Sequence, residues 1–451
     1  MFHVKHSLED TIAAIITPLG VGGVGVIRIS GPKSFNILQK IASNKIKRQP
    51  NLLQITWLMI GRVKIDQALV AFMKAPNSYT GEDTVEISCH GSITGLKRLL
   101  AEICKHGGRM AEAGEFTKRS FINGKMDLSQ AEAVIDLIEA KTDKALQNAA
   151  RQMEGWLGRE VKQVRGRIIA QLAGVEGAID FPDEIAAQRD RLNKGLAKEV
   201  GLVNKLLRTA EEGRMVREGA RVVIIGRPNV GKSSLMNALI SSDRAIVSRE
   251  AGTTRDTIEE LVNIGGSQAV IIDTAGIRTA SNEVEKEGVR RATGEIEKAD
   301  LVVLVLEGNK GLTKADQMIV EQLKGKKVVI ALNKIDLGDR GRVGMNYPQS
   351  KSSAKTGQGI PRLLALIKSQ VEKTGARPKG IKVLINLRHK ECLTSARESL
   401  IRGLAALERD DYQELVAEDL KSAIVALGEV SGESVSAEVI DQIFSRFCVG
   451  K

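Results

Sequence analysis

The sequence predicts a multidomain protein of α/β and α class, in which a small α+β domain and a discontinuous helical bundle carry an inserted α/β domain with a doubly wound sheet. Three observations lead to this fold class. Glycine-rich β-type runs occupy residues 1–120, helical stripes of apolar residues occupy 121–216 and 379–451, and apolar strands alternate with helices over 217–378. A chain of 451 residues is long enough for about two to four domains.

Residues 1–120 contain three β-type runs, Val24–Ile29, Gln67–Phe72 and Thr84–Ser88. One helical pattern of leucines and isoleucine follows over 96–103, and glycine clusters separate the elements. We therefore expect a small α+β domain here.

From Asp127 onwards the apolar residues repeat at helical spacing, and Asp127 with Gln130 resembles a capping box. The stripes cover residues 128–145, 157–179 and 192–207, and then 393–407 and 415–427. Because two or three helices alone bury little apolar surface, one bundle split in sequence is the economical interpretation. Separate bundles on either side of the α/β segment are the alternative.

Residues 226–233 read Gly-Arg-Pro-Asn-Val-Gly-Lys-Ser and lie between an apolar run and a helical segment. This is the phosphate-loop pattern in its strand–loop–helix context, which a plain glycine turn explains less well. Gly226 and Gly231 allow amide groups to wrap around phosphate oxygens. We expect Lys232 to reach the β- and γ-phosphates and to act in catalysis, and Ser233 to hold Mg²⁺.

Four further segments indicate that the nucleotide bound at this site is a guanine nucleotide. A switch segment at 252–256 is expected at the γ-phosphate, and Asp273 at a strand end is expected to hold Mg²⁺ through water. Asn333-Lys334-Ile335-Asp336 offers a carboxylate to the two N–H donors of guanine, with 353–355 beside the base oxygen. Together they predict a Ras-like GTPase domain over 217–378.

The predicted GTP site is made of the phosphate loop, the switch segment and the strand ends. Its residues are Asn229, Val230, Gly231, Lys232, Ser233, Ser234, Ser248, Arg249, Glu250, Ala251, Gly252, Thr253, Thr254, Asp273, Thr274, Ala275, Gly276, Asn333, Lys334, Asp336, Ser353, Ala354 and Lys355. Magnesium is expected on Ser233 and Thr254.

One residue departs from the Ras pattern. Ile277 stands where Ras-type enzymes carry a glutamine that positions the attacking water, and an isoleucine side chain cannot hydrogen-bond. Glu283, Glu285 and Glu287 follow, and one of them could orient the water, although a solvated helix start is the commoner meaning of such a run. The residues alone leave the choice among the three open.

Composition limits the classes of partner. A net charge of +12 and a pI of about 9.4 favour an anionic partner such as RNA, while 3% aromatic residues argue against base stacking on an aromatic sheet. Four cysteines show neither metal-ligand spacing nor a disulfide framework. Without a signal peptide or a run of 18 apolar residues, we expect a soluble, cytoplasmic protein with no membrane partner.

Five segments carry a resemblance that spans the chain. They are Thr-Pro-Leu-Gly-Val-Gly-Gly-Val-Gly-Val-Ile-Arg-Ile-Ser-Gly at 17–31, Pro-Asn-Ser-Tyr-Thr-Gly-Glu-Asp at 76–83, Gly-Glu-Phe-Thr-Lys-Arg at 114–119, Ile-Asp-Phe-Pro-Asp-Glu at 179–184 and Phe-Cys-Val-Gly-Lys at 447–451. With these, the chain resembles the MnmE (TrmE) family of bacterial tRNA-modification GTPases, of the TrmE-Era-EngA-like group.

The resemblance implies a function. Such proteins act with MnmG, a flavin- and NADH-dependent partner, to add a carboxymethylaminomethyl or aminomethyl group at C5 of the wobble uridine of certain tRNAs. A tetrahydrofolate derivative, in a 5-formyl or methylene form, supplies the carbon. The N-terminal domain binds the folate and forms the homodimer, and a heterotetramer with MnmG is expected.

The resemblance also implies site residues. Arg28, Glu86, Lys125 and Lys451 would contact the folate. The GTPase domains would pair across their nucleotide faces, with K⁺ held near the phosphates in place of an arginine finger. The residues implied for K⁺ are Asn229, Ser248, Glu250 and Thr253. Among the three glutamates, the resemblance selects Glu285 for the attacking water.

The segment 448–451, Cys-Val-Gly-Lys, fits a prenylation box only superficially, because glycine and a terminal lysine suit that box poorly. In the family a Cys-Ile-Gly-Lys tail reaches the folate site, and Val449 replaces the isoleucine here. Cys448 is then either a thiolate nucleophile that adds to the uridine ring or part of a tail that closes over the folate.

Two other functions share some of these features. A GTP-switched scaffold would bind folate and tRNA and leave all covalent chemistry to MnmG. A ribosome-assembly GTPase would share the GTPase motifs, but no appended Gly-x-x-Gly RNA clamp is evident in the sequence.

Overall fold

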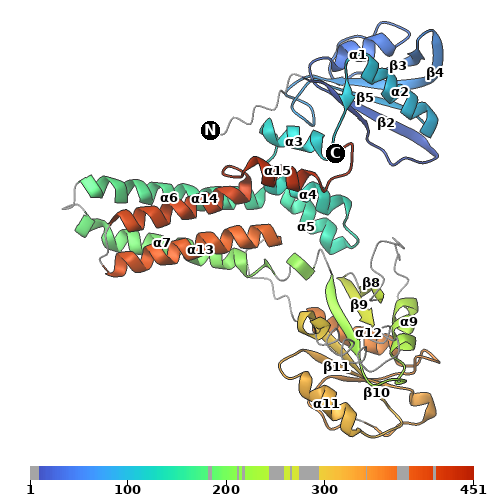
Figure 1. Cartoon of the computed structure of the whole chain (residues 1–451), viewed down its shortest axis with the longest axis vertical. Helices are drawn as coiled ribbons and strands as arrows, with labels where there is room; N and C mark the ends of the chain where they lie inside the picture. The colour runs from blue at the N-terminus through green and yellow to red at the C-terminus, as the bar shows by residue number, and fades with distance from the viewer. Residues whose placement is uncertain are drawn as a thin grey trace, which may run out of the picture. The chain divides into compact units, whose positions relative to one another are not determined.

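The computed structural model of the chain forms two compact units (Figure 1). One unit comprises Met1–Ile135, Gln152–Gly174 and Leu420–Lys451, and the other comprises Asp136–Arg151 and Val175–Asp419. The structure describes residues 10–180, 185–210, 213–215, 219–242, 258–264, 267–273, 294–341, 343–372, 385–409 and 413–451. Within these residues, no helix combines the length and the apolar character that a membrane crossing requires.

The first unit contains a six-stranded sheet with the order β3-β4-β5-β2-β1-β6. Its strands are β1 (Ile12–Ile15), β2 (Gly22–Ser30), β3 (Leu53–Ile60), β4 (Val63–Met73), β5 (Thr84–Gly91) and β6 (Arg109–Met110). All pairs are antiparallel except β1 with β6. The three predicted β-type runs lie in β2, β4 and β5, which confirms them.

Helices α1 (Ser34–Ile41) and α2 (Ile93–Lys105) cover one face of this sheet. Ile27 on β2 and Val70 on β4 are buried against Ile37 of α1 and Leu99 of α2. The predicted leucine pattern over 96–103 is the buried stripe of α2. The other sheet face carries the side chains that form one of the two sites described below.

The next helices along the chain are α3 (Glu115–Ile122) and α4 (Leu128–Ile138). The expected capping box is present, because Asp127 Oδ1 accepts from Gln130 N and Gln130 Oε1 accepts from Asp127 N, each at 2.9 Å. The single stripe expected over 128–145 is wrong. A second helix, α5 (Asp143–Met153), starts where the Thr142 hydroxyl accepts from Ala145 N.

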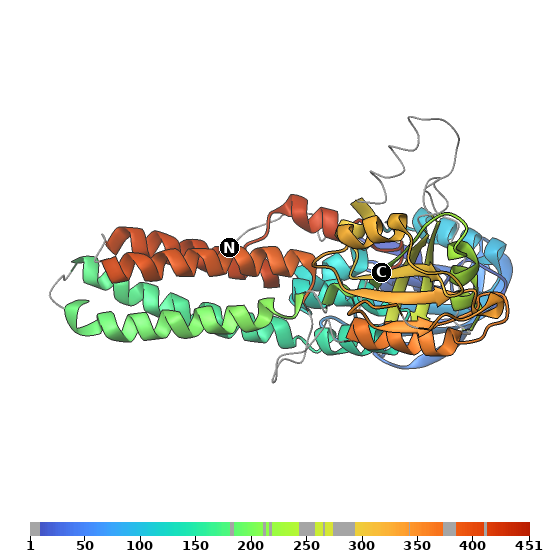
Figure 2. The ribbon, with the colours of Figure 1, turned by 90° about the horizontal axis from the view of Figure 1, so that it is seen from below.

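Helices from both sides of the α/β segment pack together. Helix α6 (Trp156–Asp180) is bound to α14 (Gln413–Ser431) where Arg165 Nε donates to Ile424 O at 3.2 Å, and α15 (Ala437–Phe444) follows α14. In the second unit, α7 (Ile185–Leu207) lies beside α13 (Leu387–Arg409) in both views (Figure 1 and Figure 2). Each pair joins a helix that precedes the α/β segment to one that follows it, so the helical part is discontinuous in sequence, as predicted.

The second unit also contains a sheet with the order β12-β11-β10-β7-β9-β8, parallel except at β8. Its elements are β7 (Ala220–Ile225), α9 (Lys232–Ser242), β8 (Ile258–Ile264), β9 (Ser267–Asp273), β10 (Leu301–Glu307), α11 (Lys314–Gln322), β11 (Val328–Asn333), the 3-10 turn η3 (Ile335–Leu337), β12 (Gln349–Lys351) and α12 (Ile360–Glu372). Both faces are buried, because Val222 and Ile224 of β7 join one core and Val223 and Ile225 the other. This is the predicted doubly wound sheet.

Candidate functional site

The loop between β7 and α9 has the backbone that its glycines were expected to supply. Gly226 and Gly231 have φ values of +152° and +95°. A Cβ atom on Gly226 would lie 2.5 Å from Val305 O, and one on Gly231 would lie 2.5 Å from Asn333 Nδ2. Both positions therefore require glycine for the close approach as well as for the backbone angle.

Lys232 begins α9 and is buried. Its Nζ donates to Gly226 O and to Arg227 O, each at 3.0 Å, so the ammonium group is held over the inside of the loop. Ser233 and Ser234 are exposed in the first turn of α9, and Val230 is buried. The arrangement places a cation and a helix N-terminus together, which favours bound phosphate.

Asn333, at the end of β11, joins the phosphate loop to the segment after β12. Its Nδ2 donates to Val230 O at 3.0 Å, and its Oδ1 accepts from Ala354 N at 3.0 Å. The side chain is 1% exposed. Two of the predicted base-side segments thus meet the phosphate loop through one amide, a link that the separate motifs did not predict.

Lys334 forms a second link to the phosphate loop. Its Nζ donates to Asn229 O at 2.5 Å and to Glu307 Oε1 at 2.6 Å. Hydrogen bonds from Lys310 and Lys334 hold the pKa of Glu307 below its usual value. Glu307 was missed from sequence, and the only available signal was its position at the end of β10, next to β11.

Asp336 and Ser353 lie together, as the guanine motif requires. Ser353 Oγ donates to Asp336 Oδ1 at 2.6 Å and accepts from Thr356 N at 3.2 Å, which orients the carboxylate. Lys355 is exposed in the same turn.

Arg227 anchors the other side of the loop by donating from Nε to Asp316 Oδ1 at 2.7 Å. Burial alone would raise the pKa of Asp316, but hydrogen bonds from Thr313 and Arg227 bring it below its usual value. Arg227 and Asp316 were also missed as parts of the site.

The rest of the predicted nucleotide site lies outside the described residues, apart from Asp273, whose backbone ends β9 opposite Ile224 of β7. The predictions that fall there are Ser248, Arg249, Glu250, Ala251, Gly252, Thr253, Thr254, Thr274, Ala275, Gly276 and Glu285.

A second cluster lies on the sheet of the first unit. Arg28 of β2 and Glu86 of β5 are paired in register, and Arg28 Nε donates to Glu86 Oε1 at 2.9 Å. The guanidinium carbon of Arg28 lies 4.9 Å from the centroid of the Tyr79 ring and 5.5 Å from that of Phe116. Tyr79 and Phe116 were not predicted as site residues, although both lie in the segments that carry the family resemblance.

The segment 448–451 docks beside this cluster. Val449 bridges to Ala113, Gly114 N donates to Cys448 O at 3.4 Å, and Phe116 N donates to Lys451 O at 3.1 Å. Cys448 is exposed. Lys125 Nζ donates to Pro76 O at 3.0 Å, in the segment that carries Tyr79. The four predicted folate residues therefore come from elements that meet around Phe116 and Tyr79.

Gly450 is required for this docking. Its φ is +103°, and a Cβ atom there would lie 2.8 Å from Ile15 O and 3.0 Å from Ile16 Cα. Only glycine allows the segment to approach the end of β1 so closely.

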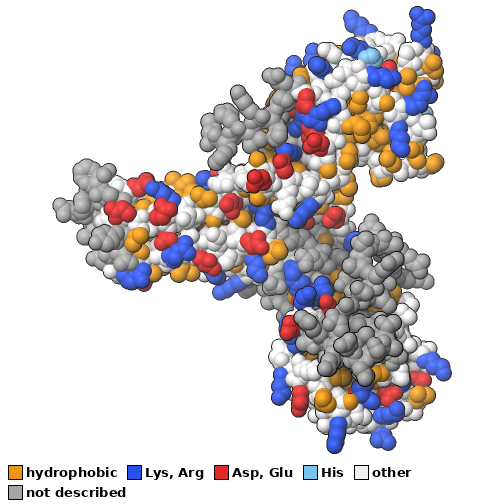
Figure 3. All heavy atoms as spheres, in the orientation of Figure 1, with side chains coloured by type: hydrophobic (Ala, Val, Ile, Leu, Met, Phe, Trp, Pro, Cys, Tyr) orange, Lys and Arg blue, Asp and Glu red, His pale blue; other side chains and the backbone are white. Residues whose placement is uncertain are grey.

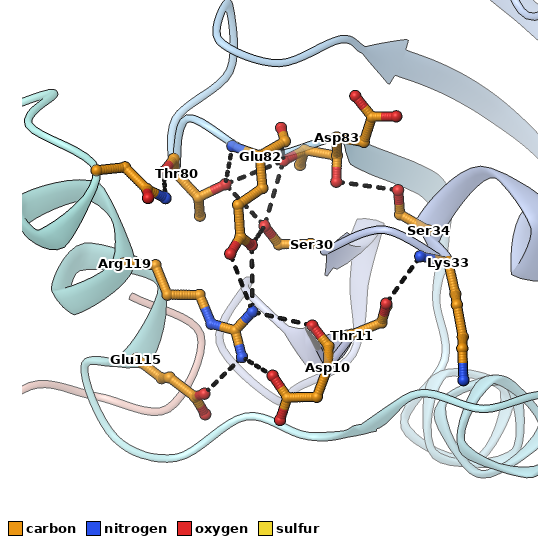
Figure 4. A network of polar contacts seen from close by, with 12 residues as sticks. Asp10, Thr11, Ser30, Lys33, Ser34, Thr80, Glu82, Asp83, Glu115 and Arg119 are labelled. Carbon is orange, nitrogen blue, oxygen red and sulfur yellow. Dashed lines mark hydrogen bonds and ion pairs between the residues drawn. The ribbon is translucent and has the colours of Figure 1, made fainter. Parts of the chain in front are cut away.

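A buried arginine holds the elements around the second cluster (Figure 4). Arg119 of α3 donates to Asp10 Oδ1 at 2.6 Å, Glu115 Oε1 at 3.0 Å and Glu82 Oε1 at 3.1 Å, and its side chain is 5% exposed. Burial would raise the pKa values of Asp10 and Glu115, but their bonds to Arg119 and Arg109 lower them. The network fixes the segment of Tyr79 and the start of α3 against the sheet.

Known proteins match the parts of the chain that contain the two sites. The family description "GTP-binding protein TrmE N-terminus" matches residues 11–125, and "MnmE helical domain" matches residues 128–448. The tRNA modification GTPase MnmE of Alkaliphilus oremlandii is 42% identical over 461 residues, which cover 98% of this chain and 100% of the relative. That of Clostridioides difficile is 42% identical over 465 residues, with the same two shares.

Solved structures of GTPase domains are also similar to part of the chain. The G domain of the FeoB iron transporter of T. maritima matches with 26% identity and a TM-score of 0.26, covering 35% of this chain and 99% of that one. A variant of Aquifex aeolicus Era bound to GDP and AlF4⁻ matches with 25% identity and a TM-score of 0.27, covering 40% and 66%. From the family descriptions and the full-length relatives, the chain belongs to the MnmE family of tRNA modification GTPases.

Proposed function

We propose that this chain hydrolyses GTP to drive modification of the wobble uridine of certain tRNAs at C5, together with the flavoprotein MnmG. The product would carry a carboxymethylaminomethyl or aminomethyl group, with the carbon drawn from a tetrahydrofolate derivative. The observation that carries this proposal is the docking of segment 448–451 beside Arg28 and Glu86, in a chain that also holds a phosphate loop. A nucleotide site alone would not require that second cluster.

The nucleotide site uses its own residues to bind and orient GTP. Lys232 and the amides of the loop would hold the phosphates, and Asp336 would accept the two N–H donors of guanine. Mg²⁺ would be held by Ser233 and Thr254, whose hydroxyl oxygens suit a hard cation, and would neutralise phosphate charge. Glu285 would orient the attacking water.

Potassium would take the place of an arginine finger. The ligands proposed are Asn229, Ser248, Glu250 and Thr253, of which the structure describes only Asn229. Its φ of +64° puts this residue in the left-handed region, at the turn of the phosphate loop. A monovalent cation there would neutralise charge between β- and γ-phosphate oxygens when two GTPase domains pair.

The second cluster is suited to a folate. Among the described residues, Oε2 of Glu86 accepts no hydrogen bond, so it can receive the N–H donors of a pterin. Lys125 and Lys451 supply cations for the glutamate tail, and the rings of Tyr79 and Phe116 offer apolar contact.

A homodimer through the N-terminal domain is supported by an apolar surface on the same sheet face. The surface consists of Leu53, Ile55 and Trp57 of β3 and Leu69 of β4, all exposed. Hydrophobic side chains gather on this domain in Figure 3. Because Glu86 pairs in register with Ala71 and Ala71 with Leu53, the surface continues directly from the folate cluster.

Mass analysis of nucleosides in total tRNA tests the function. Cells that lack this chain should lose the C5-modified wobble uridines and regain them when the gene is restored. If the nucleosides are unchanged in cells without the gene, the tRNA pathway is refuted, and ribosome profiles would then test the assembly-factor alternative.

The scaffold alternative is favoured by one observation, since Cys448 is exposed and its backbone alone is bonded to the sheet domain. Replacing Cys448 by serine keeps those backbone bonds. Retained modification in cells that carry C448S would support the scaffold, whereas loss of modification with normal GTP hydrolysis would support a nucleophilic thiolate.

A further inference from the structure

Helix α7 exposes a stripe of basic side chains that neither proposed site uses. The stripe consists of Arg191, Lys194, Lys198, Lys205 and Arg208, the last of which lies just beyond the helix end. At 100° per residue, these spacings place all five within about 100° of the helix circumference. At a rise of 1.5 Å per residue, the stripe is about 26 Å long.

The positive charge of the stripe is not neutralised locally. Across the described part of the chain, none of the five side chains forms an ion pair, whereas Arg165 pairs with Glu433 and Arg402 with Asp419. On α7 itself, Glu199 is buried on the opposite face, and Asp190 precedes the stripe. Unpaired cations in a row produce a positive field that attracts a polyanion.

The residues between the charges indicate which polyanion fits. Ala197 and Gly201 lie within the stripe, and a Cβ atom on Gly201 would meet nothing within 4 Å. A membrane-binding helix needs a large apolar face, and a protein interface relies on aromatic anchors, but this stripe has neither. Cations without apolar or aromatic anchors suit a phosphate backbone.

The helix that packs against α7 carries charges of both signs. Helix α13 exposes Glu391, Glu398 and Glu408 together with Arg402 and Arg409. A negatively charged backbone would therefore be attracted more strongly to the row of cations on α7 than to the mixed charges of its neighbour.

We propose that the α7 stripe binds the phosphate backbone of the tRNA substrate. This inference rests on the proposed function and names where its macromolecular substrate lies. Because a row of cations on one exposed helix face attracts phosphates chiefly through charge, the stripe would position the tRNA without selecting its sequence. Selection of the wobble uridine would then occur elsewhere.

The test compares three variants of the full-length chain. The first replaces Lys194, Lys198 and Lys205 by glutamine, and the second replaces them by arginine. The third, a charge-matched control, replaces the exposed Lys40, Lys45 and Lys47 by glutamine. Binding of a tRNA transcript with a wobble uridine is followed by fluorescence anisotropy between about 50 and 200 mM salt.

The glutamine variant of α7 should bind tRNA at least about tenfold more weakly at physiological salt, with a salt-dependence slope shallower by about 2–3. The arginine variant and the control should bind like the unchanged chain. GTP hydrolysis should be equal in all of them, because none of these lysines belongs to the nucleotide site, and this also shows that each variant is folded.

Four results would overturn the proposal. Equal weakening by the control triple would mean that only net charge matters. Unchanged tRNA affinity in the α7 variant, with weaker binding of the flavoprotein, would assign the stripe to an acidic protein surface. An unchanged chain that neither binds tRNA nor restores C5-modified uridine would refute the proposed function too, whereas restored modification with stripe-independent tRNA binding would refute the stripe alone.

Discussion

The amide of Asn333 holds three segments of the nucleotide site with two hydrogen bonds. Its neighbour Lys334 adds bonds to Asn229 O and to Glu307. The segment proposed to read the base is therefore coupled to the loop proposed to hold the phosphates, although more than 100 residues separate Val230 from Asn333. Such a coupling makes a single side chain important both for the fold of the domain and for its ligand.

Replacing Asn333 by alanine should lower GTP affinity by about tenfold or more and destabilise the GTPase domain by about 1–3 kcal/mol. The reason is that Ala354 N and Val230 O would be left buried without a partner. Binding of a fluorescent GTP analogue and thermal unfolding would measure the two effects.

The matched control is Ser350→Ala on β12, because that buried hydroxyl has no hydrogen-bond partner among the residues that the structure describes. It should change neither quantity appreciably. Similar losses in both variants would contradict the role given to the Asn333 amide.

At the scale of elements, local signals were predictable and contacts between distant segments were not. Asp127 and Gln130 predict the start of α4 from sequence, because both hydrogen bonds of this capping box are made within four residues. The start of α5 was missed because the Thr142 cap leaves the apolar spacing unchanged. Strand β3 was missed because apolar residues occupy both its exposed and its buried face at a sheet edge, so they show no clear alternation with polar residues.

The sites follow the same division. The phosphate loop and the motif around Asp336 are contiguous in sequence, so their residue types are enough to predict them. Tyr79, Glu307 and Arg119 act through partners on other elements, and one sequence contains no signal for such pairs.

The Arg119 network predicts a dependence of stability on pH. Asp10 and Glu115 have lowered pKa values in the folded state, so their contribution is present above their unfolded values and is lost as pH falls below about 5. Chemical denaturation of the full chain between neutral and acidic pH should show this loss. A free energy of unfolding that stays constant or rises on acidification would contradict it.

Replacing Arg119 by methionine should cost about 3–5 kcal/mol, because buried carboxylates would lose their cation. The control Lys105→Met removes an exposed partner of Glu102 in the same domain and should cost less than about 1 kcal/mol. Equal costs would mean that the buried network contributes no more than an exposed ion pair.

Because segment 448–451 docks through Gly450, this residue can be used to test the proposed folate cluster. Gly450→Ala should reduce binding of a tetrahydrofolate derivative, measured by equilibrium dialysis, because the new Cβ would collide with Ile15 and undock Lys451. Gly107→Ala is the control, since Gly107 has the same φ of +103° but its nearest neighbour would be Lys33 Cδ at 3.6 Å. Equal folate affinity in both variants would contradict a role for segment 448–451 in folate binding.

At the scale of the whole molecule, the apolar surface of β3 and β4 predicts a change of oligomeric state. Trp57→Glu should convert a dimer to a monomer in sedimentation equilibrium, because it buries a charge in the proposed interface. Met318→Glu alters an equally apolar exposed position on α11 and should leave the dimer intact. If the Trp57→Glu protein remains dimeric, the dimer interface does not include the apolar surface of β3 and β4.

The docking of segment 448–451 onto residues 113–116 also imposes an order on biosynthesis. At roughly 5–20 residues per second, the ribosome reaches Lys451 roughly 17–67 s after Phe116. During that interval the N-terminal sheet can fold, but segment 448–451 is not yet present beside the cluster of Arg28 and Glu86. A nascent chain would therefore lack part of the proposed folate cluster, and a product that stalls after the GTPase domain would be unable to couple GTP hydrolysis to the proposed one-carbon transfer.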